Sequence, residues 1–164
     1  MNQPAVTLKQ IMDAGNRALA ILIPIMEAKG VHGKDGLYLT AQFLHERMSA
    51  TFKVGIVSDP EKQANDQASS QERAARLLEF FASNGHKTSR ESRDFELEKY
   101  AGAVLVSPLN LILAPAGLPE DADEALGLYV GCDLAEDFQA EAYKIAQKAE
   151  NDYFFRMLSA KTAA

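Results

Sequence analysis

The sequence predicts a helix-rich α+β domain in which a small, mainly antiparallel sheet packs against several amphipathic helices. Stretches with helical periodicity lie towards both ends of the chain, and short β-branched segments lie around residues 51–57 and 101–114. The length of 164 residues is that of one domain. We therefore expect a single domain over residues 1–164, with residues 159–164 as a frayed tail.

The first helix is expected to start after Thr7. Thr7 and Gln10 have the spacing of a capping box, in which each side chain satisfies a backbone N–H at the helix start. Apolar residues then recur at helical spacing: Leu8, Ile11, Met12, Leu19, Leu22 and Met26. Pro24 predicts a kink or an early end of the helix, and the segment Gly30–Gly36 predicts a loop.

Residues 37–48 fit two different predictions. Leu37, Ala41, Leu44 and Met48 have helical spacing, but the run Leu37-Tyr38-Leu39-Thr40 equally suits the start of a strand. The segment 51–57 is β-branched and aromatic and is followed by Ser58-Asp59-Pro60. It is therefore expected to be a strand at or near the centre of the sheet.

The second half of the chain should begin with a helix over residues 69–84. The polar segment Glu61–Ala68 has no apolar period, whereas Ser69 and Glu72 have capping-box spacing. Apolar residues follow at helical spacing: Ala74, Leu77, Leu78 and Phe81. Asn84-Gly85 is a helix stop signal, and the polar stretch His86–Glu98 is expected to be a surface connection.

The remaining elements are a hairpin and two helices. Apolar runs at 101–106 and 109–114 flank Ser107-Pro108, which predicts two antiparallel strands. Pro119 and the acidic residues after it predict a helix to about Cys132. Asp133–Glu136 is expected to cap one final helix, whose apolar stripe is Phe138, Ala142, Ile145, Ala149 and Tyr153.

Charge and cysteine content limit the classes of partner. A net charge of −6 disfavours nucleic acid, because an acidic protein repels the phosphate backbone. The single cysteine, Cys132, can form neither an internal disulfide nor a cysteine zinc site, which favours the cytoplasm. Ala18–Met26 is shorter than the roughly 20 residues of a spanning helix, and Met1–Gln10 lacks the basic start of a signal peptide. No membrane partner is therefore expected.

The motifs of the common enzyme classes are missing from the sequence. It contains no dinucleotide-binding glycine motif, P-loop, Gly-x-Ser-x-Gly elbow or His-Glu-x-x-His zinc helix. Gly30, Gly33 and Gly36 lie between two candidate helices, so a plain loop is favoured over a phosphate cradle. Cys132 as a nucleophile would need a nearby base, which the sequence does not indicate. The catalytic residues stay unknown, and the balance favours a protein that is not an enzyme.

Two polar clusters are candidate binding sites. His86, Lys87, Arg90 and Arg93 form the most basic short stretch, which suits a carboxylate or phosphate ligand; the alternative is a solvated loop.

Asp123 and Glu124, with Glu120 and Asp121, suit a hard cation such as Mg²⁺ or Ca²⁺, with His45 as a further candidate metal ligand. The helix dipole alone also favours acidic residues in a first turn. His45 and Met48 are one turn apart if their segment is helical, which makes them candidate axial ligands for haem; the alternative places Met48 in the core.

The last helix carries more apolar side chains than one packed face needs. Tyr153, Phe154, Phe155 and Leu158 are spread around it. This end is therefore either covered by the rest of the domain or forms an interface, and we expect a homo-oligomer.

Two regions carry a family resemblance. One is Leu8-Lys9-Gln10-Ile11 with Ala14 and Ala18, and the other runs from Ala101–Val106 through Leu111-Ile112-Leu113 to the segment Pro119–Ala125. Together they resemble the GlcG/HbpS family of small haem- or cofactor-binding α/β domains. The resemblance implies a profilin-like sheet against helices, oligomeric assembly and small-ligand binding, with haem as one candidate cofactor. No ligand residue carries over, because Ser58-Asp59-Pro60-Glu61 stands where the family has its glycine-rich segment.

The sequence thus favours a non-enzymatic domain that binds or senses a small ligand of unknown identity. Two alternatives stay open. One is an oligomeric interaction or assembly protein that uses the aromatic C-terminal helix, and the other is a small hydrolase or transferase that uses the acidic cluster or Cys132.

Overall fold

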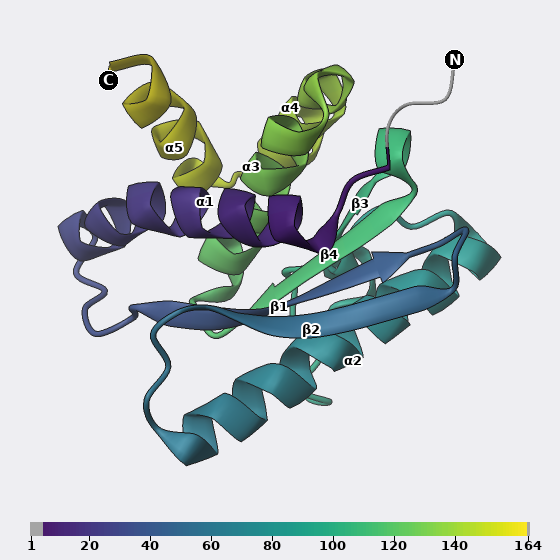
Figure 1. The fold of residues 1–164 in the computed structure, drawn as a ribbon, viewed down its shortest axis with the longest axis horizontal. Helices are drawn as coiled ribbons and strands as arrows, with labels where there is room; N and C mark the ends of the chain where they lie inside the picture. Colours follow the sequence, from purple (N-terminus) through teal and green to yellow (C-terminus); the bar gives the residue numbers. More distant parts are fainter. Residues whose placement is uncertain (1–4, 164) are drawn as a thin grey trace.

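The computed structural model describes residues 5–163. At its centre is a four-stranded antiparallel sheet in the order β2-β1-β4-β3 (Figure 1). The strands are β1 (Gly36–Phe43), β2 (Met48–Gly55), β3 (Val104–Val106) and β4 (Leu111–Ala116). The predicted class, a helix-rich α+β fold with an antiparallel sheet, is therefore confirmed.

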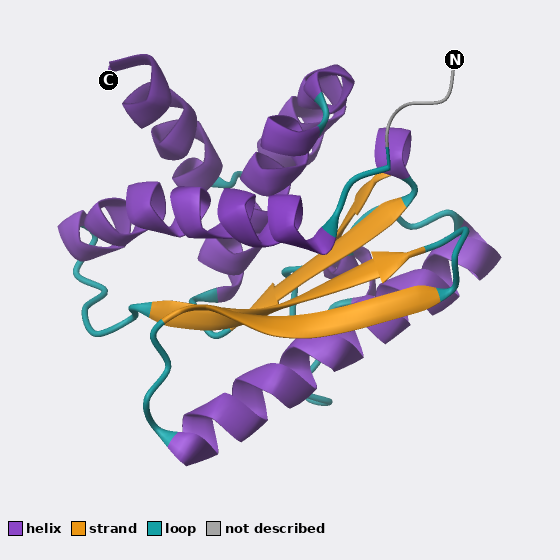
Figure 2. Ribbon diagram, in the orientation of Figure 1, coloured by secondary structure: helices purple, strands orange, loops and turns teal. Residues whose placement is uncertain are grey.

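Helices cover both faces of the sheet (Figure 2). One face packs against α2 (Pro60–Asn84), and the other against α1 (Leu8–Ala28) and α3 (Glu120–Leu134). The C-terminal helices α4 (Gln139–Lys148) and α5 (Asp152–Ala163) pack on α3, away from the sheet. Within residues 5–163 no helix is long and apolar enough to cross a membrane.

Side chains of β1 alternate between the two cores. Leu39 and Ala41 are fully buried in the core shared with α1 and α3. Thr40 points to the other face, where its hydroxyl oxygen lies 2.7 Å from the Ser70 hydroxyl of α2. Because successive strand residues point to opposite faces, one strand serves both cores. Residues 37–43 are therefore a strand, which decides between the two predictions for 37–48.

The predicted strand at 51–57 forms β2, but its expected central position is wrong. It pairs only with β1 and is an edge strand, with Val54 as its one fully buried residue. Lys53 is exposed beside it, a charge that protects a free edge against pairing with other chains. Ile56 and Val57 lie beyond the end of the strand.

The predicted hairpin near residues 101–114 is confirmed. Val104 pairs with Leu113 and Val106 pairs with Leu111, and a short 3₁₀ turn over Ser107–Leu109 connects the two strands. All residues of both strands are buried, because helices cover both faces of the sheet here.

The helix α2 starts earlier than predicted. Asp59 is its N-cap, accepting a hydrogen bond from the Glu61 N–H at 3.0 Å, and Pro60 is the first helical residue. Proline suits this position because its missing N–H has no partner there in any case. The polar segment 61–68 is therefore helix with exposed sides, and the capping-box pattern at Ser69 lies inside it.

The termini also differ in part from the expectations. The capping box at Thr7 is present, with the Gln10 N–H donating to Thr7 Oγ1 at 3.2 Å, but α1 continues past Pro24 to Ala28. The expected single final helix is instead split into α4 and α5.

Glu150 has a left-handed φ of +53° at the break between α4 and α5, and Asn151 Oδ1 caps α5 by accepting the Phe154 N–H at 3.2 Å. Residues 159–163, expected to be frayed, are helical in α5, whereas Ala164 lies outside the described residues.

Candidate functional site

The candidate site is built around Arg73, in the middle of α2. Ser70, one turn earlier, fixes this side of the helix by donating to the Ala114 carbonyl at 2.6 Å. The Arg73 side chain is only 8% exposed, and its Nη1 donates to the Pro115 carbonyl at 2.7 Å and to Asp123 Oδ2 at 2.8 Å. Its Nε and Nη2 donate no hydrogen bond to the described residues, and neither atom is completely buried. One edge of the guanidinium is thus held by the protein, and the other is open.

Asp123 fixes the orientation of Arg73. It is fully buried in the first turn of α3, and its Oδ1 accepts the Leu118 N–H at 3.1 Å. Burial raises the pKa of Asp123 to about 6, and the pairing with Arg73 and the Leu118 hydrogen bond offset only part of this rise. Both carboxylate oxygens of Asp123 are therefore hydrogen-bonded within the protein.

Two glycines leave room for close packing around these side chains. A Cβ on Gly102 (φ +141°) would lie 2.5 Å from Arg73 Nη1, and a Cβ on Gly117 (φ +135°) would lie 2.8 Å from Asp66 Oδ2. Residues with a side chain rarely adopt such φ angles. Glycine is thus required before β3 and after β4, where the backbone approaches α2.

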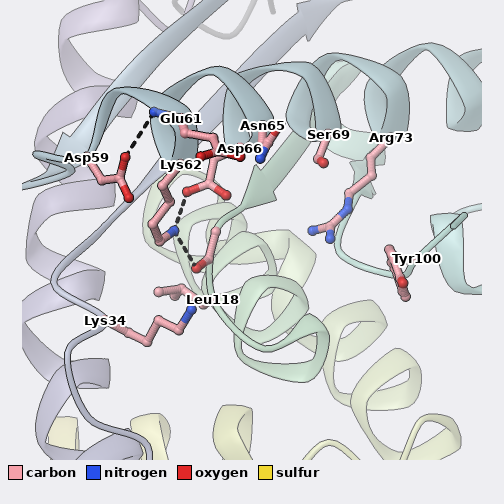
Figure 3. Close-up of a pocket in the computed structure, with 11 residues that line it drawn as sticks. Lys34, Asp59, Glu61, Lys62, Asn65, Asp66, Ser69, Arg73, Tyr100 and Leu118 are labelled. Carbon is pink, nitrogen blue, oxygen red and sulfur yellow. Dashed lines mark hydrogen bonds and ion pairs between the residues drawn. The ribbon is translucent and has the colours of Figure 1, made fainter.

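A cavity of about 440 Å³ has Arg73 in its lining (Figure 3). Its wall includes the N-terminal half of α2, the loop before β1 and the loop between β4 and α3. The side chains that can donate hydrogen bonds into it include Lys34, Lys62, Asn65, Ser69, Arg73 and Tyr100. Those from α2 are three or four residues apart, so one side of the helix presents all of them. The cavity is therefore lined mainly by polar groups.

Lys62 closes one end of this cavity. Its Nζ bonds the Asp66 carboxylate and the Gly117 carbonyl, the latter at 3.1 Å, which ties α2 to the β4–α3 loop. Lys34 reaches the same space from the loop before β1, and no acidic partner for it is present among residues 5–163. Figure 3 shows the nitrogens of Lys34, Lys62 and Arg73 directed towards one cavity.

Two smaller hollows, of about 300 and 290 Å³, share Arg73 and Tyr100 with the cavity. Leu97 lines one and Phe95 lines the other, and both side chains are more than half exposed. Arg76 of α2 holds the connection between α2 and β3 in place by donating to the backbone carbonyls of Ser89, Ser92 and Tyr100. The site thus has a polar cavity with more apolar hollows next to it.

The basic stretch predicted to bind an anion is instead paired within the protein. Arg90 Nε donates to Glu124 at 3.0 Å and its Nη2 bonds Asp121, while Arg93 bonds Glu120 at 2.9 Å. The acidic start of α3 therefore neutralises these arginines, and the two clusters singled out in the sequence bind each other.

The other two members of that stretch also contact the protein, although the buried Nδ1 of His86 has no hydrogen-bond partner among the described residues. Lys87 lies 2.9 Å from Glu141, and His86 stacks on Phe80 with the ring centroids 5.3 Å apart. The Lys87 side chain is also half exposed, whereas that of Arg73 is largely buried. The stretch does not line the cavity, so its predicted role as an anion clamp has no support.

The predicted metal ligands are not brought together. Asp123 and Glu124 are each paired with an arginine, and His45 lies exposed in the turn between β1 and β2. No group of three metal-binding side chains occurs in the part of the chain that the structure describes. Met48 is 48% exposed at the start of β2, so neither the haem arrangement with His45 nor the core position expected for Met48 is present.

The remaining sequence candidates have structural roles. The glycine-rich segment before β1 is a loop, as predicted, with Gly36 as the first residue of the strand. Burial raises the pKa of the Cys132 thiol to about 11, so its reactive thiolate form is disfavoured at neutral pH.

The apolar C-terminal residues are largely covered by the domain itself. Phe154 is fully buried in the core, and Tyr153, Phe155 and Leu158 are partly buried against it. Phe154 and Phe155 also pack edge-on against Tyr143 of α4, at centroid distances of 6.1 and 5.3 Å. Of the two explanations that the sequence left open, the structure favours internal packing.

Sequence reasoning missed the residues that line the cavity. The segment 61–68 has no apolar period and the helix is predicted only from Ser69, so the sequence pattern does not align Lys62 and Asn65 with Arg73. The signal for it was Asp59-Pro60, a helix start with the cap and the proline in their favoured places. A helix from Pro60 would have placed these polar residues on one side.

Comparison with models of known families, with curated proteins and with solved structures found no match for this chain.

Proposed function

We propose that this chain is a non-enzymatic binding domain for a small polar ligand, which it holds in the cavity beside Arg73. The observation that carries the proposal is the open edge of the Arg73 guanidinium. This side chain is more than nine-tenths buried, yet two of its nitrogens have no partner within residues 5–163. Both nitrogens keep some exposure, so a ligand that enters the cavity can reach these charged donors and accept hydrogen bonds from them.

The size and lining of the cavity fit this role. About 440 Å³ lies within the range of small-molecule sites, which start near 300 Å³. Polar side chains such as Asn65, Ser69 and Tyr100 offer further hydrogen bonds. Because most small-molecule sites are more apolar, this lining favours a polar ligand over a large apolar one such as haem.

The alternative functions have less support. An assembly role for the C-terminal helix needs exposed aromatic residues, but Phe154 is buried. A hydrolase or transferase would need a free acid or a reactive thiol, yet Asp123 and Glu124 are paired with arginines and the Cys132 thiol has a raised pKa. A homo-oligomer also belongs to the proposal, but only the family resemblance supports it, since the C-terminal aromatic residues pack within the domain. A cytoplasmic location is supported by the sequence arguments alone.

A thermal-shift screen tests the proposal. Carboxylic acids, amino acids, sugars, nucleotides, flavins and haem are each added to the wild type and to two variants. Ser69→Trp fills the cavity from an exposed position of α2, and Gln67→Trp places the same side chain on an exposed position that does not line it. Neither substitution removes a core side chain.

A ligand at one hundred times its Kd adds about 2.7 kcal/mol of stability, which raises Tm by roughly 5 to 11 °C for a chain of this size. We expect at least one compound class to produce such a rise in the wild type and in Gln67→Trp, but not in Ser69→Trp. A rise that persists unchanged in Ser69→Trp, or the lack of any rise across the set, would contradict the proposal.

A further inference from the structure

We propose that the ligand is a linear dicarboxylate, with one carboxylate on the open edge of Arg73 and the other on Lys34. This inference rests on the proposed function and specifies the chemistry of the same cavity. It follows from the number, kind and direction of the donors that the cavity presents.

The first carboxylate site is the edge of Arg73 formed by Nε and Nη2. These two N–H groups are parallel and match the two oxygens of a carboxylate, which gives a bidentate, charge-assisted contact. Nη1 already bonds Asp123 and the Pro115 carbonyl, so the guanidinium is held in place before a ligand arrives. A prearranged donor pair loses less entropy when it binds.

The second carboxylate site lies across the cavity, at Lys34. Its ammonium has no acidic partner among the residues of the described chain, and it points into the same space as Arg73 (Figure 3). Lys62 lies close to this end and carries a second positive charge, although Asp66 already neutralises it. Two cationic groups therefore face each other along the cavity, which suits a ligand with an anionic group at each end.

Three acidic residues also line the cavity, and two of them already bond to groups of the protein. Asp66 is bound to Lys62, and Asp59 caps α2 through the Glu61 N–H. Glu61 is exposed at the start of the helix. The donors that remain inside are those of Arg73, Lys34 and neutral side chains, a set that favours an acceptor-rich ligand.

Isothermal titration calorimetry with matched acids tests the inference. The dicarboxylates are succinate, glutarate, adipate and pimelate, and the monocarboxylates of the same carbon number are butyrate, pentanoate, hexanoate and heptanoate. Each is titrated into the wild type, Lys34→Gln, the cavity-filling Ser69→Trp and the control Lys53→Gln. Lys53 lies exposed on the edge strand β2, outside the cavity, so its substitution removes one charge from the protein surface only.

We expect the best dicarboxylate to bind the wild type at least about tenfold more tightly than the monocarboxylate with the same number of carbons, because a second charge-assisted contact is made. The ratio should fall to about one in Lys34→Gln and persist in Lys53→Gln. A ratio near one in the wild type, or one that survives in Lys34→Gln, would overturn the dicarboxylate.

The failure of the inference and the failure of the proposed function give different results. Suppose that monocarboxylates or another compound class bind at least as tightly as the dicarboxylates, and that Ser69→Trp abolishes this binding. The cavity would then remain a ligand site, but a dicarboxylate would be excluded. Binding that Ser69→Trp leaves unchanged would remove both.

Discussion

The most specific prediction concerns the pH dependence of stability that Asp123 contributes. Its carboxyl group is fully buried, and burial raises its pKa from 3.8 to about 6. The native protein therefore keeps this proton to a higher pH than the unfolded chain. In linkage terms, the native state binds more protons between about pH 4 and 6, so stability falls as pH rises through this window. The shift corresponds to about 3 kcal/mol.

The perturbation is Asp123→Asn, which has nearly the same shape but does not titrate. At pH 4 the wild type and the variant both carry an uncharged side chain at this position, and as the pH rises only the wild type gains a buried charge, which is paired with Arg73. Only the pH dependence of the difference carries the test. The free energy of unfolding of the wild type minus that of the variant should fall by about 3 kcal/mol between pH 4 and pH 7.5.

Urea unfolding followed by circular dichroism, at half-unit steps of pH, measures this difference. Asp152→Asn is the matched control, because hydrogen bonds from Lys29 and Arg156 lower the pKa of Asp152, so its contribution should have the opposite sign. A difference for Asp123 that is flat, or that grows with pH, would refute the reasoning. A difference that grows with pH would mean that the pairing with Arg73 lowers the pKa of Asp123 by more than burial raises it.

Three further predictions test the packing of the domain. Gly117→Ala should destabilise the protein by about 1 to 3 kcal/mol in chemical unfolding, because a side chain at this φ is strained and its Cβ would contact Asp66. Gly85→Ala has no neighbour within 4 Å, so it should cost only about 1 kcal/mol, from its φ alone. Equal costs for the two variants would contradict the contact at Gly117. Phe154→Ala should lose about 3 to 5 kcal/mol, and a loss below 1 kcal/mol would show that α5 is not part of the core. Cys132 should react slowly with iodoacetamide at pH 8 in the native state, as its raised pKa implies, and a rate like that of the unfolded chain would contradict its burial.

Much of the fold was predictable because local patterns agree with the final packing. The capping box at Thr7, the apolar runs around Ser107-Pro108 and the acidic start of α3 each mark an element that the structure contains. The class follows from these elements, since helices at both ends must cover a sheet formed by the middle.

The errors arose where tertiary contacts decide. Residues 37–48 fit helix and strand equally well, and pairing on both sides by β2 and β4 makes them mainly strand. The position of β2 at the edge depends on which strand pairs where, information that a single strand's composition does not contain.

The candidate site was the least predictable part. The basic stretch with Arg90 and Arg93 and the acidic start of α3 were each visible as charge clusters, but only the fold shows that they neutralise each other. Arg73 stands in a polar helix without a motif around it, and the residue that holds its Nη1 is Asp123, which is 50 residues later in the chain. Such a long-range pairing leaves no local pattern in the sequence.

The central claim, that the open edge of Arg73 contacts a ligand, is tested most directly by NMR of the arginine side chains. The Arg73 Nε–H resonance, assigned by its loss in Arg73→Lys, is followed during a titration with sodium acetate and compared with sodium chloride at equal ionic strength. We predict a saturable shift of Arg73 with acetate alone, while Arg17, exposed and paired with Asp133, stays in place. An Arg73 resonance that does not move, or that moves equally with chloride, would contradict the account.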